Sequence, residues 1–191
     1  MYFFFKRIFD IFFSVLIVIP IIIILIILYI FIKIESKGPF IHWSRRVGID
    51  NKIFYMPKIR TMIVGSPDVA THLLKDPDKF VTKIGHILRK KSLDELPQIY
   101  SVLKGDMSLV GPRPALHNQG DLISERKKYE IDAIKPGITG WAQINGRDNL
   151  TIIEKVQLDK YYYINKSVLL DLLILFKTLV KSFNNKYDIS H

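Results

Sequence analysis

The sequence predicts an α+β, mostly helical protein. An N-terminal re-entrant membrane helix, broken at Pro20, is expected to precede a small cytosolic domain with short strands and interfacial amphipathic helices. Three observations lead to this prediction: an uncharged apolar run near the N-terminus, apolar residues at helical spacing in much of the remaining chain, and two segments too rich in glycine and proline for regular helix. We place the membrane helix in residues 1–35 and the domain in residues 36–191.

The run from Ile11 to Ile32 contains no formal charge. A helix of this length, rising about 1.5 Å per residue, reaches roughly 33 Å, against a hydrocarbon core of about 30 Å. Pro20 lies near the middle of the run. A proline inside a helix removes one backbone hydrogen bond and clashes with the carbonyl four residues earlier, so we expect a bend at Pro20.

Basic residues flank the run on both sides, with Lys6 and Arg7 before it and Lys33 and Lys37 after it. A spanning helix usually has its basic residues on one side only. The flanks therefore predict a helix that enters the membrane, bends and leaves on the same face. A cleaved signal peptide is not expected, because the run is too long and no small-residue cleavage pattern follows it.

The composition narrows the classes of function. A chain of 191 residues leaves room for one compact domain after the run. Beside a membrane segment, the net charge of +10 indicates an anionic leaflet or a phosphorylated substrate rather than nucleic acid. The absence of cysteine excludes disulfides, thiolate catalysis and cysteine-ligated zinc, and it fits a cytoplasmic-facing domain.

The elements of the domain follow from turn signals and apolar periodicity. In order, we expect a short strand at 53–55, a polar loop with a short helix at 65–80, two helices within 80–104 that meet near 91–92, ordered loops at 105–115 and 135–147, and helices at 151–163 and 167–183. The apolar face of the last helix predicts either core packing or contact with the membrane interface.

The segment Ser92-Leu93-Asp94-Glu95 allows two interpretations. It matches a capping box, in which Ser92 caps a helix and Glu95 reaches back to the Ser92 amide. Alternatively, Asp94 is an ionised carboxylate stabilised by the helix dipole, beside an acid able to hold Mg²⁺ and near the cations of Arg89–Lys91. Such a carboxylate is a plausible nucleophile toward a phosphoryl group. Glu95 can serve only one of these purposes well.

Two loops carry further candidate ligands. In Gly111-Pro112-Arg113-Pro114 the two prolines stiffen the backbone around Arg113, so that Arg113 could bind phosphate at low entropic cost. The alternative is that Arg113 is a solvated residue of a structural turn. The loop at 135–147 contains four side chains that could stack on a nucleotide or hydrogen-bond to it: Trp141, Gln143, Asn145 and Arg147. Trp141 could equally anchor the domain at a membrane interface.

These blocks together resemble one family. Several stretches of the chain are similar in sequence and order to the bacterial sugar transferases. The longest are 89–98, 103–114 and 135–147, and the shorter ones are Lys6-Arg7-Ile8-Phe9-Asp10, Lys58-Ile59-Arg60-Thr61-Met62 and Leu158-Asp159 before Tyr162. These are the monotopic polyprenyl-phosphate phosphoglycosyl transferases. The resemblance covers essentially the whole chain, and the length resembles the small single-domain members, similar to the initiating enzyme of bacterial N-glycosylation.

The resemblance implies an enzyme that transfers a sugar 1-phosphate from a UDP-sugar to undecaprenyl phosphate and releases UMP. By the same match, Asp94 is the nucleophile that forms a covalent phosphosugar intermediate, and Glu95 beside Asp94 helps to hold Mg²⁺. Arg89, Arg113 and Lys58 would contact phosphate. The implied location is the cytoplasmic face of the bacterial inner membrane, among membrane lipids, with a second copy of the chain or pathway glycosyltransferases as further partners.

The membrane helix departs from the family pattern. Members of the family commonly have Ser-Pro at the bend, whereas this chain has Ile19-Pro20, about one turn earlier. Serine can satisfy backbone groups that a kink releases, and isoleucine cannot.

Two other classes of protein are weighed against this enzyme. A non-catalytic basic scaffold for anionic lipid explains the charge and the apolar run, but not the acidic pair. A conventional nucleotide-sugar glycosyltransferase would need a metal motif, and the only candidate in this chain is Asp76-Pro77-Asp78, which we interpret as a turn.

The sugar is not identified by the sequence. We expect residues 65–80 and 114–119 to select it, and an N-acetylated amino or deoxyamino sugar is the expectation by similarity. The product could enter a glycoprotein, an O-antigen or a capsule.

Overall fold

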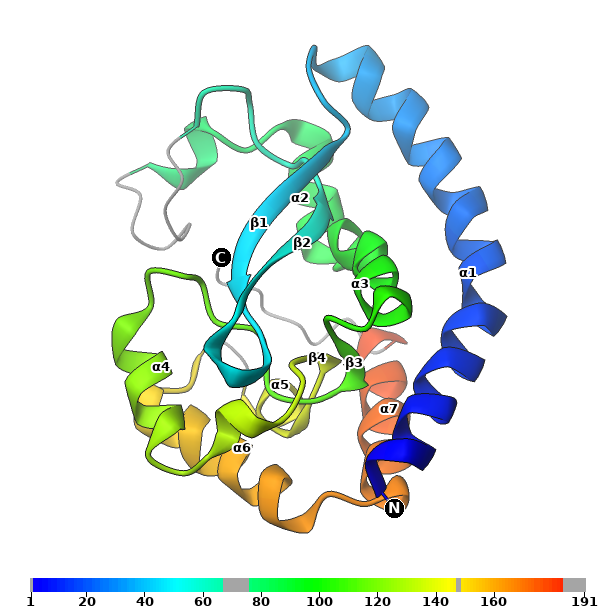
Figure 1. Cartoon of the computed structure of the whole chain (residues 1–191). Coiled ribbons are helices and arrows are strands. Elements are labelled where there is room, and N and C mark those ends of the chain that lie inside the picture. The colour runs from blue at the N-terminus through cyan, green and yellow to red at the C-terminus, as the bar shows by residue number, and fades with distance from the viewer. Residues whose placement is uncertain (1, 67–75, 147–148, 184–191) are drawn as a thin grey trace.

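The computed structural model describes residues 2–66, 76–146 and 149–183 (Figure 1). Arg147 therefore lies outside the described residues, as does most of the 65–80 loop. The main elements are α1 (Tyr2–Glu35), β1 (Ile41–Val47), β2 (Ile53–Ile59), α2 (Lys83–Lys90), the 3-10 segment η4 (Leu93–Gln98), α3 (Ile99–Lys104), β3 (Ser108–Val110), α4 (Gly120–Lys127), β4 (Gly137–Thr139), α5 (Trp141–Ile144), α6 (Ile152–Asn165) and α7 (Val168–Phe183). Short 3-10 turns lie at Ile49–Asn51, Pro77–Lys79 and Ile131–Ala133.

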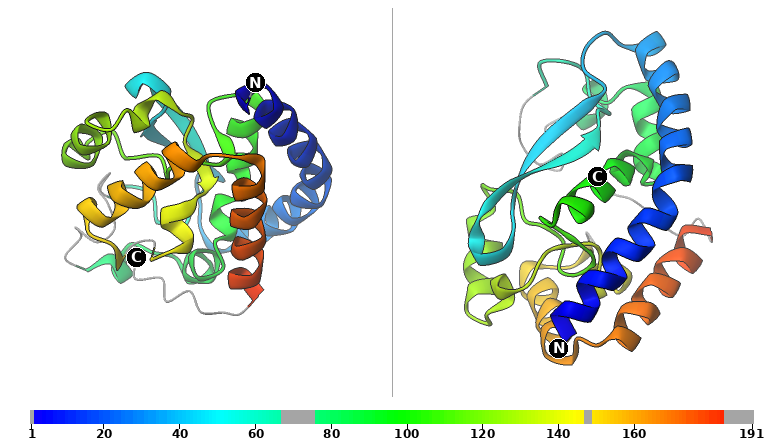
Figure 2. Two further views of the ribbon diagram at one scale, coloured as in Figure 1. Left: turned by 90° about the horizontal axis from the view of Figure 1, so that it is seen from below. Right: turned by 45° about the vertical axis from the view of Figure 1, so that its right-hand side comes forward.

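The helix α1 is long and apolar enough to cross a membrane, by length and composition. It remains helical through Pro20, so the expected break is not confirmed. The ribbon instead changes direction near its middle and follows the outside of the domain (Figure 2). Only 6% of its most apolar 18-residue window is buried inside the domain, whereas the core helix of a soluble protein is mostly buried.

One narrow face of α1 packs on the domain. The buried residues of this face recur at intervals of about one to three turns: Lys6, Asp10, Ser14, Ile21 and Ile32. Both ends of the helix are attached. Near the N-terminus, Arg7 donates to carbonyls of α3, and at the C-terminus the Glu35 carboxylate accepts from the Lys83 and Ile84 amides of α2.

Strands β1 and β2 form an antiparallel hairpin, paired from Ile41 with Ile59 to Val47 with Ile53. The expected strand at 53–55 is confirmed and extends to Ile59, whereas β1 is not predicted from the sequence. Alternate residues such as Phe54 and Met56 are buried, as one face of the hairpin covers the core. Lys58 lies on this inner side, between two buried neighbours.

Strands β3 and β4 form a two-stranded parallel pair inside the two segments expected to be ordered loops. Three-residue strands that are almost fully buried leave no alternation in the sequence. Glycine makes the approach possible: a Cβ at Gly137 would lie 2.1 Å from the Gly111 nitrogen, and one at Gly140 would lie 2.1 Å from the Gly111 oxygen. The loop around Arg113 is thereby packed directly on the segment that contains Gln143.

The helices predicted within 80–104 and at 151–163 and 167–183 are confirmed, but α4 was not predicted, and the short helix α5 lies within 135–147, where an ordered loop was expected. Two helical segments, α2 and the η4–α3 pair, meet near residues 91–92. The helix α6 begins with a capping box made by Thr151 and Glu154. In α7, Asp171 and Ile174 are buried, while apolar side chains on the outer side are exposed: Leu169, Leu172, Leu173, Phe176 and Leu179. One helix therefore has both a core face and an exposed apolar face.

Candidate active site

The acidic pair lies on η4, which begins after a sharp change of backbone direction. Ser92 precedes it with φ 52°, in the left-handed region, and its side chain makes no capping hydrogen bond. Glu95 does not reach back to the Ser92 amide, because its carboxylate binds two cations from other elements. The capping-box interpretation is therefore wrong, and Glu95 faces the interior of the site.

Glu95 joins three elements of the domain. Its Oε1 atom accepts from Lys58 Nζ of β2 at 3.0 Å and from Arg113 Nη2 at 2.7 Å. Its Oε2 atom accepts from Arg113 Nη1 at 3.4 Å, which gives the forked arrangement typical of arginine and carboxylate. Burial of Lys58 lowers the pKa of its ammonium, although the Glu95 carboxylate acts in the opposite direction.

Asp94 is 8% exposed and lies among charges of both signs. Burial raises the pKa of its carboxyl group above the ordinary value, and the Glu95 carboxylate acts in the same direction. Lys58, Arg89 and Arg113 act in the opposite direction. The net direction is opposite to the lowering of the pKa expected from a helix terminus, and burial is its largest cause.

Arg89 approaches the acidic pair from the last turn of α2. Its Nε atom donates to Thr61 Oγ1 at 2.8 Å, and the Asp94 carboxylate opposes the lowering of its pKa by burial. Three of the predicted residues, Arg89, Lys58 and Arg113, thus form the cationic surroundings of Asp94. Thr61, which orients Arg89, is a contact that sequence reasoning missed.

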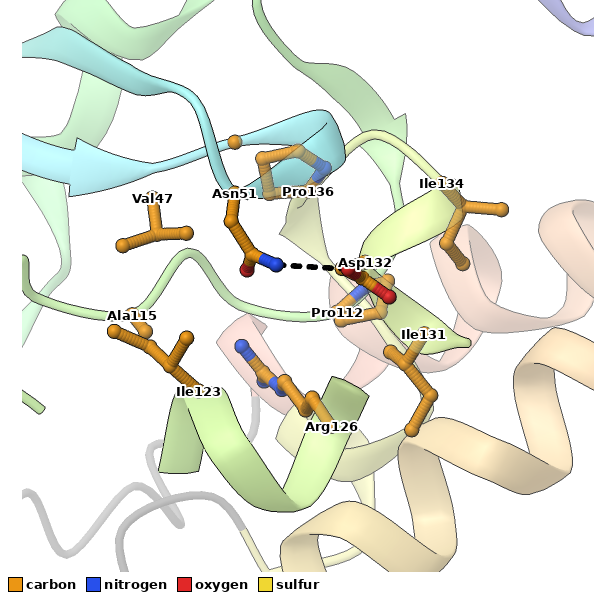
Figure 3. Close-up of a pocket in the computed structure, with 11 residues that line it drawn as sticks. Val47, Asn51, Pro112, Ala115, Ile123, Arg126, Ile131, Asp132, Ile134 and Pro136 are labelled. Carbon is orange, nitrogen blue, oxygen red and sulfur yellow. Dashed lines mark hydrogen bonds between the residues drawn. The ribbon is translucent and has the colours of Figure 1, made fainter. Parts of the chain in front are cut away.

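The loop around Arg113 is supported from behind by a buried pair. Arg126 of α4 donates through Nη1 to the Arg113 carbonyl at 2.8 Å, and through Nε and Nη2 to Asp159 Oδ2 at 3.0 and 2.6 Å. Arg126 also lines a pocket beside Pro112, where Asn51 donates to Asp132 at 2.7 Å (Figure 3). The residues that line this pocket do not include the acidic pair.

Arg126 has no signal in the sequence, because an arginine in a polar helix is usually solvated. Asp159 belongs to one of the blocks that resemble the family, and its partner becomes apparent only in three dimensions. Burial raises the pKa of the Asp159 carboxyl group, while the Arg126 guanidinium opposes this change.

The predicted nucleotide ligands lie on and after α5. The Trp141 ring stacks on Tyr161 with a centroid distance of 5.2 Å, and the Lys177 ammonium lies over it at 5.4 Å. Asn145 donates to the Trp141 carbonyl at 2.7 Å. Gln143 is 8% exposed, and neither polar atom of its amide has a hydrogen-bond partner among the described residues. No hydrogen bond between this group and the acidic pair is seen in the described part of the chain.

Comparison with known proteins gives a consistent result. The model of the family described as bacterial sugar transferase matches residues 1–185. An undecaprenyl-phosphate galactose phosphotransferase of Salmonella typhimurium is 39% identical over 191 residues, covering 92% of this chain and 40% of that protein. A UDP-glucose:undecaprenyl-phosphate glucose-1-phosphate transferase of Escherichia coli is 40% identical, covering 95% of this chain and 40% of that protein.

One similar protein has a comparable length. The uncharacterized sugar transferase EpsL of Bacillus subtilis is 40% identical over 176 residues, covering 92% of this chain and 86% of that protein. The chain thus spans about 40% of the length of the Salmonella and Escherichia relatives, and most of the length of the Bacillus relative.

Proposed function

The chain belongs to the bacterial sugar transferase family, and from this premise we propose that it transfers a sugar 1-phosphate from a UDP-sugar to undecaprenyl phosphate and releases UMP. The observation that carries the proposal is a buried Asp94 among three cations, beside a Glu95 that does not cap its own helix. The names of the Salmonella and Escherichia relatives include undecaprenyl phosphate and two different sugars, galactose and glucose.

The proposed chemistry has two steps. A carboxylate oxygen of Asp94 attacks the phosphorus that carries the sugar, the bond from that phosphorus to the bridging oxygen breaks, and UMP leaves with the electron pair. A phosphate oxygen of undecaprenyl phosphate then attacks the same phosphorus, and the bond to Asp94 breaks, which restores the carboxylate. Arg89, Arg113 and Lys58 stabilise the phosphate oxygens throughout. Two steps allow a small site to bind the two substrates in turn.

We propose Mg²⁺ as the cofactor. Mg²⁺ is commonly bound by one or two carboxylates together with substrate phosphates and water. Glu95 and Asp94 supply such a pair, and the described residues contain no cluster of three or more histidine, aspartate or glutamate side chains that would form a complete protein site. When bound, the ion would neutralise charge on the diphosphate, while Glu95 keeps some of its oxygen lone pairs for Lys58 and Arg113.

For the donor nucleotide, we propose that Gln143 supplies its unpartnered amide and that Trp141 or Asn145 supports it. Gln143 lies next to the contact between Gly140 and Gly111, because a Cβ at Gly140 would be 2.7 Å from Gln143 Oε1. This places the amide beside the loop that carries Arg113. An amide that is buried without a partner costs free energy, which a hydrogen bond to a ligand would recover.

We propose that the protein lies on the cytoplasmic face of the bacterial inner membrane, with α1 and the outer face of α7 in contact with lipid. The two helices meet where Lys6 of α1 pairs with Asp171 of α7 at 3.0 Å (Figure 2). Since both ends of α1 bond to the same domain, a helix that enters and leaves one leaflet is favoured over one that spans. The exposed apolar residues of both helices support this arrangement.

The reaction is tested with purified protein, Mg²⁺, undecaprenyl phosphate and a panel of UDP-sugars that includes galactose, glucose and their N-acetylated amino forms. We expect UMP release with at least one sugar, dependent on Mg²⁺. The same panel identifies the sugar. Absence of release with every donor would contradict the proposal and favour a membrane-bound scaffold without catalytic activity.

The topology is tested by single cysteines, since the chain has none of its own. A cysteine at the N-terminus and one in residues 36–52 are both expected to react with a reagent confined to the cytoplasmic side, as does a reference cysteine in α4. Labelling of the first two from opposite sides would show that α1 spans the membrane.

A further inference from the structure

The first turns of α1 bond to the two chain segments that carry the candidate catalytic residues. Arg7 donates through Nη1 to the Val102 carbonyl at 2.6 Å and through Nη2 to the Leu103 carbonyl at 2.8 Å. These carbonyls belong to the last turn of α3, where no further turn of helix follows. The Val102 carbonyl also accepts from the Gly105 amide at 3.1 Å, so Arg7 adds a second donor there. Since α3 begins directly after η4, Arg7 anchors the far end of the segment that bears Asp94 and Glu95.

Asp10, almost one turn further along α1, bonds to the second catalytic segment. Its Oδ1 atom accepts from the Leu109 amide of β3 at 3.2 Å, and Asp10 is 2% exposed. The strand β3 ends at Val110, just before the Gly111-Pro112-Arg113 loop. Because proline limits the backbone of that loop, a displacement of β3 is expected to move Arg113 with it.

A buried polar network holds this part of α1 in place. Lys6 Nζ pairs with Asp171 at 3.0 Å and lies 3.5 Å from Asp10. Asp171 of α7 also accepts from the Tyr2 and Tyr162 hydroxyls at 3.0 and 2.8 Å. The Tyr162 hydroxyl is in turn 3.2 Å from the Val110 carbonyl, so the network returns to β3. Arg7 and Asp10 thus project from a turn fixed on several sides.

We infer that Arg7 and Asp10 are positioning residues: they hold the Asp94–Glu95 segment and the Arg113 loop in a fixed relation to each other and to the membrane helix. The inference rests on the proposed function. It assigns to α1 a role in active-site geometry in addition to membrane attachment. The height of the reacting groups above the membrane is then set by direct bonds from the helix to both halves of the site.

The test for Arg7 compares Arg7→Lys and Arg7→Gln with Lys37→Gln in lipid vesicles. Lysine keeps the charge but cannot supply the two diverging donors, so it separates geometry from charge. We expect kcat to fall by about ten- to hundredfold in Arg7→Gln, because the catalytic groups are displaced, and by a smaller factor in Arg7→Lys. The KM for the UDP-sugar stays unchanged, since the lost interaction acts on the chemical step. Lys37→Gln removes one exposed flanking charge and keeps the wild-type kcat.

The test for Asp10 compares Asp10→Asn with Asp10→Ala. Asparagine retains an acceptor for the Leu109 amide, whereas alanine does not. Asp10→Ala is expected to lose about tenfold or more in kcat, and Asp10→Asn to recover much of that activity. Hydrogen exchange provides a measurement that does not depend on activity: the Leu109 amide exchanges faster in Asp10→Ala and remains protected in Asp10→Asn.

Three outcomes would overturn the inference: wild-type kcat in Arg7→Gln and Asp10→Ala, an equal loss in Lys37→Gln, or losses that match the fraction of protein detached from vesicles or unfolded. Failure of the proposed function is recognised separately. In that case the wild-type protein itself releases no UMP with any donor, while the exchange rate of the Leu109 amide still reports the contact with Asp10.

Discussion

Replacement of Asp94 by asparagine is expected to reduce UMP release by about 10⁴-fold or more, since an amide cannot replace the carboxylate as nucleophile. The side chain is nearly isosteric, so the cations of Lys58, Arg89 and Arg113 remain in place to bind phosphate. The measurement is UMP release with the sugar found in the panel. Intact-protein mass after mixing with donor alone should show one added sugar phosphate in the wild type and none in Asp94→Asn.

The matched control is Asp76→Asn. Asp76 is exposed and pairs with Lys79 at 2.6 Å, in the Asp76-Pro77-Asp78 stretch that the alternative class of glycosyltransferase would use for metal. We expect wild-type activity in this variant. An active Asp94→Asn would rule out Asp94 as the nucleophile, and an inactive Asp76→Asn would instead favour the alternative class.

The same replacement is expected to make the folded domain more stable at neutral pH. Burial raises the pKa of Asp94 in the folded state, so folding is penalised when the carboxyl group is ionised. The penalty is absent below the unfolded pKa of about 3.9 and is fully present once the pH exceeds the folded value. Thermal unfolding should therefore show a higher Tm for Asp94→Asn than for wild type at pH 7, with a difference that shrinks as the pH falls toward 4.

Replacement of Glu95 by glutamine is expected to lower both activity and stability. Glutamine leaves Lys58 and Arg113 without their shared carboxylate, and the three side chains are at most 26% exposed. Loss of one partner from such a partly buried group costs about 2 to 3 kcal/mol of unfolding free energy. Activity should fall about 10² to 10³-fold, because the phosphate-binding cations are no longer oriented.

The control for Glu95 is Glu125→Gln, which removes a carboxylate from a surface pair with Lys128 on α4. An exposed pair of this kind contributes at most about 1 kcal/mol, so this variant should unfold like the wild type. Chemical denaturation and UMP release measure the two effects. If Glu95→Gln unfolds at the wild-type denaturant concentration, Glu95 does not hold the two cations together in solution.

The opposite signs expected for the two replacements follow from their surroundings. Asp94 contributes charge at a cost in stability. Glu95 instead pairs directly with the cations of Lys58 and Arg113. In the proposed reaction, the acidic pair is thus divided into one group that would react and one group that orients the surrounding cations. Neighbouring positions in the sequence do not reveal this division, because it depends on which cations reach each carboxylate.

Particular residues show where sequence reasoning reached its limit in this chain. The pattern Ser92 to Glu95 is a local signal for a capping box, and it failed because Lys58 and Arg113 compete successfully for the Glu95 carboxylate. The left-handed backbone of Ser92 has no signature in the residue type. The break predicted at Pro20 is not confirmed: α1 remains helical through Pro20 and changes direction near its middle (Figure 2).

Periodicity and motif order were sufficient for much of the fold and for the identity of the acidic pair. Helices such as α6 and α7 follow from apolar spacing and capping residues, which act over a few positions. The short strands β3 and β4 do not, because their pairing depends on the contact of Gly111 with Gly137 across distant segments. Arg126 and Asp159 were hidden for the same reason.

The linear chain therefore determined the apolar run, the acidic pair and the family, since each depends on residue types at short spacing. Only the tertiary structure decided that Glu95 binds Lys58 and Arg113, that burial raises the pKa of Asp94, and that Arg7 and Asp10 bond α1 to α3 and β3. These properties arise from desolvation and from bonds between distant segments, and both come into existence only when the chain has folded.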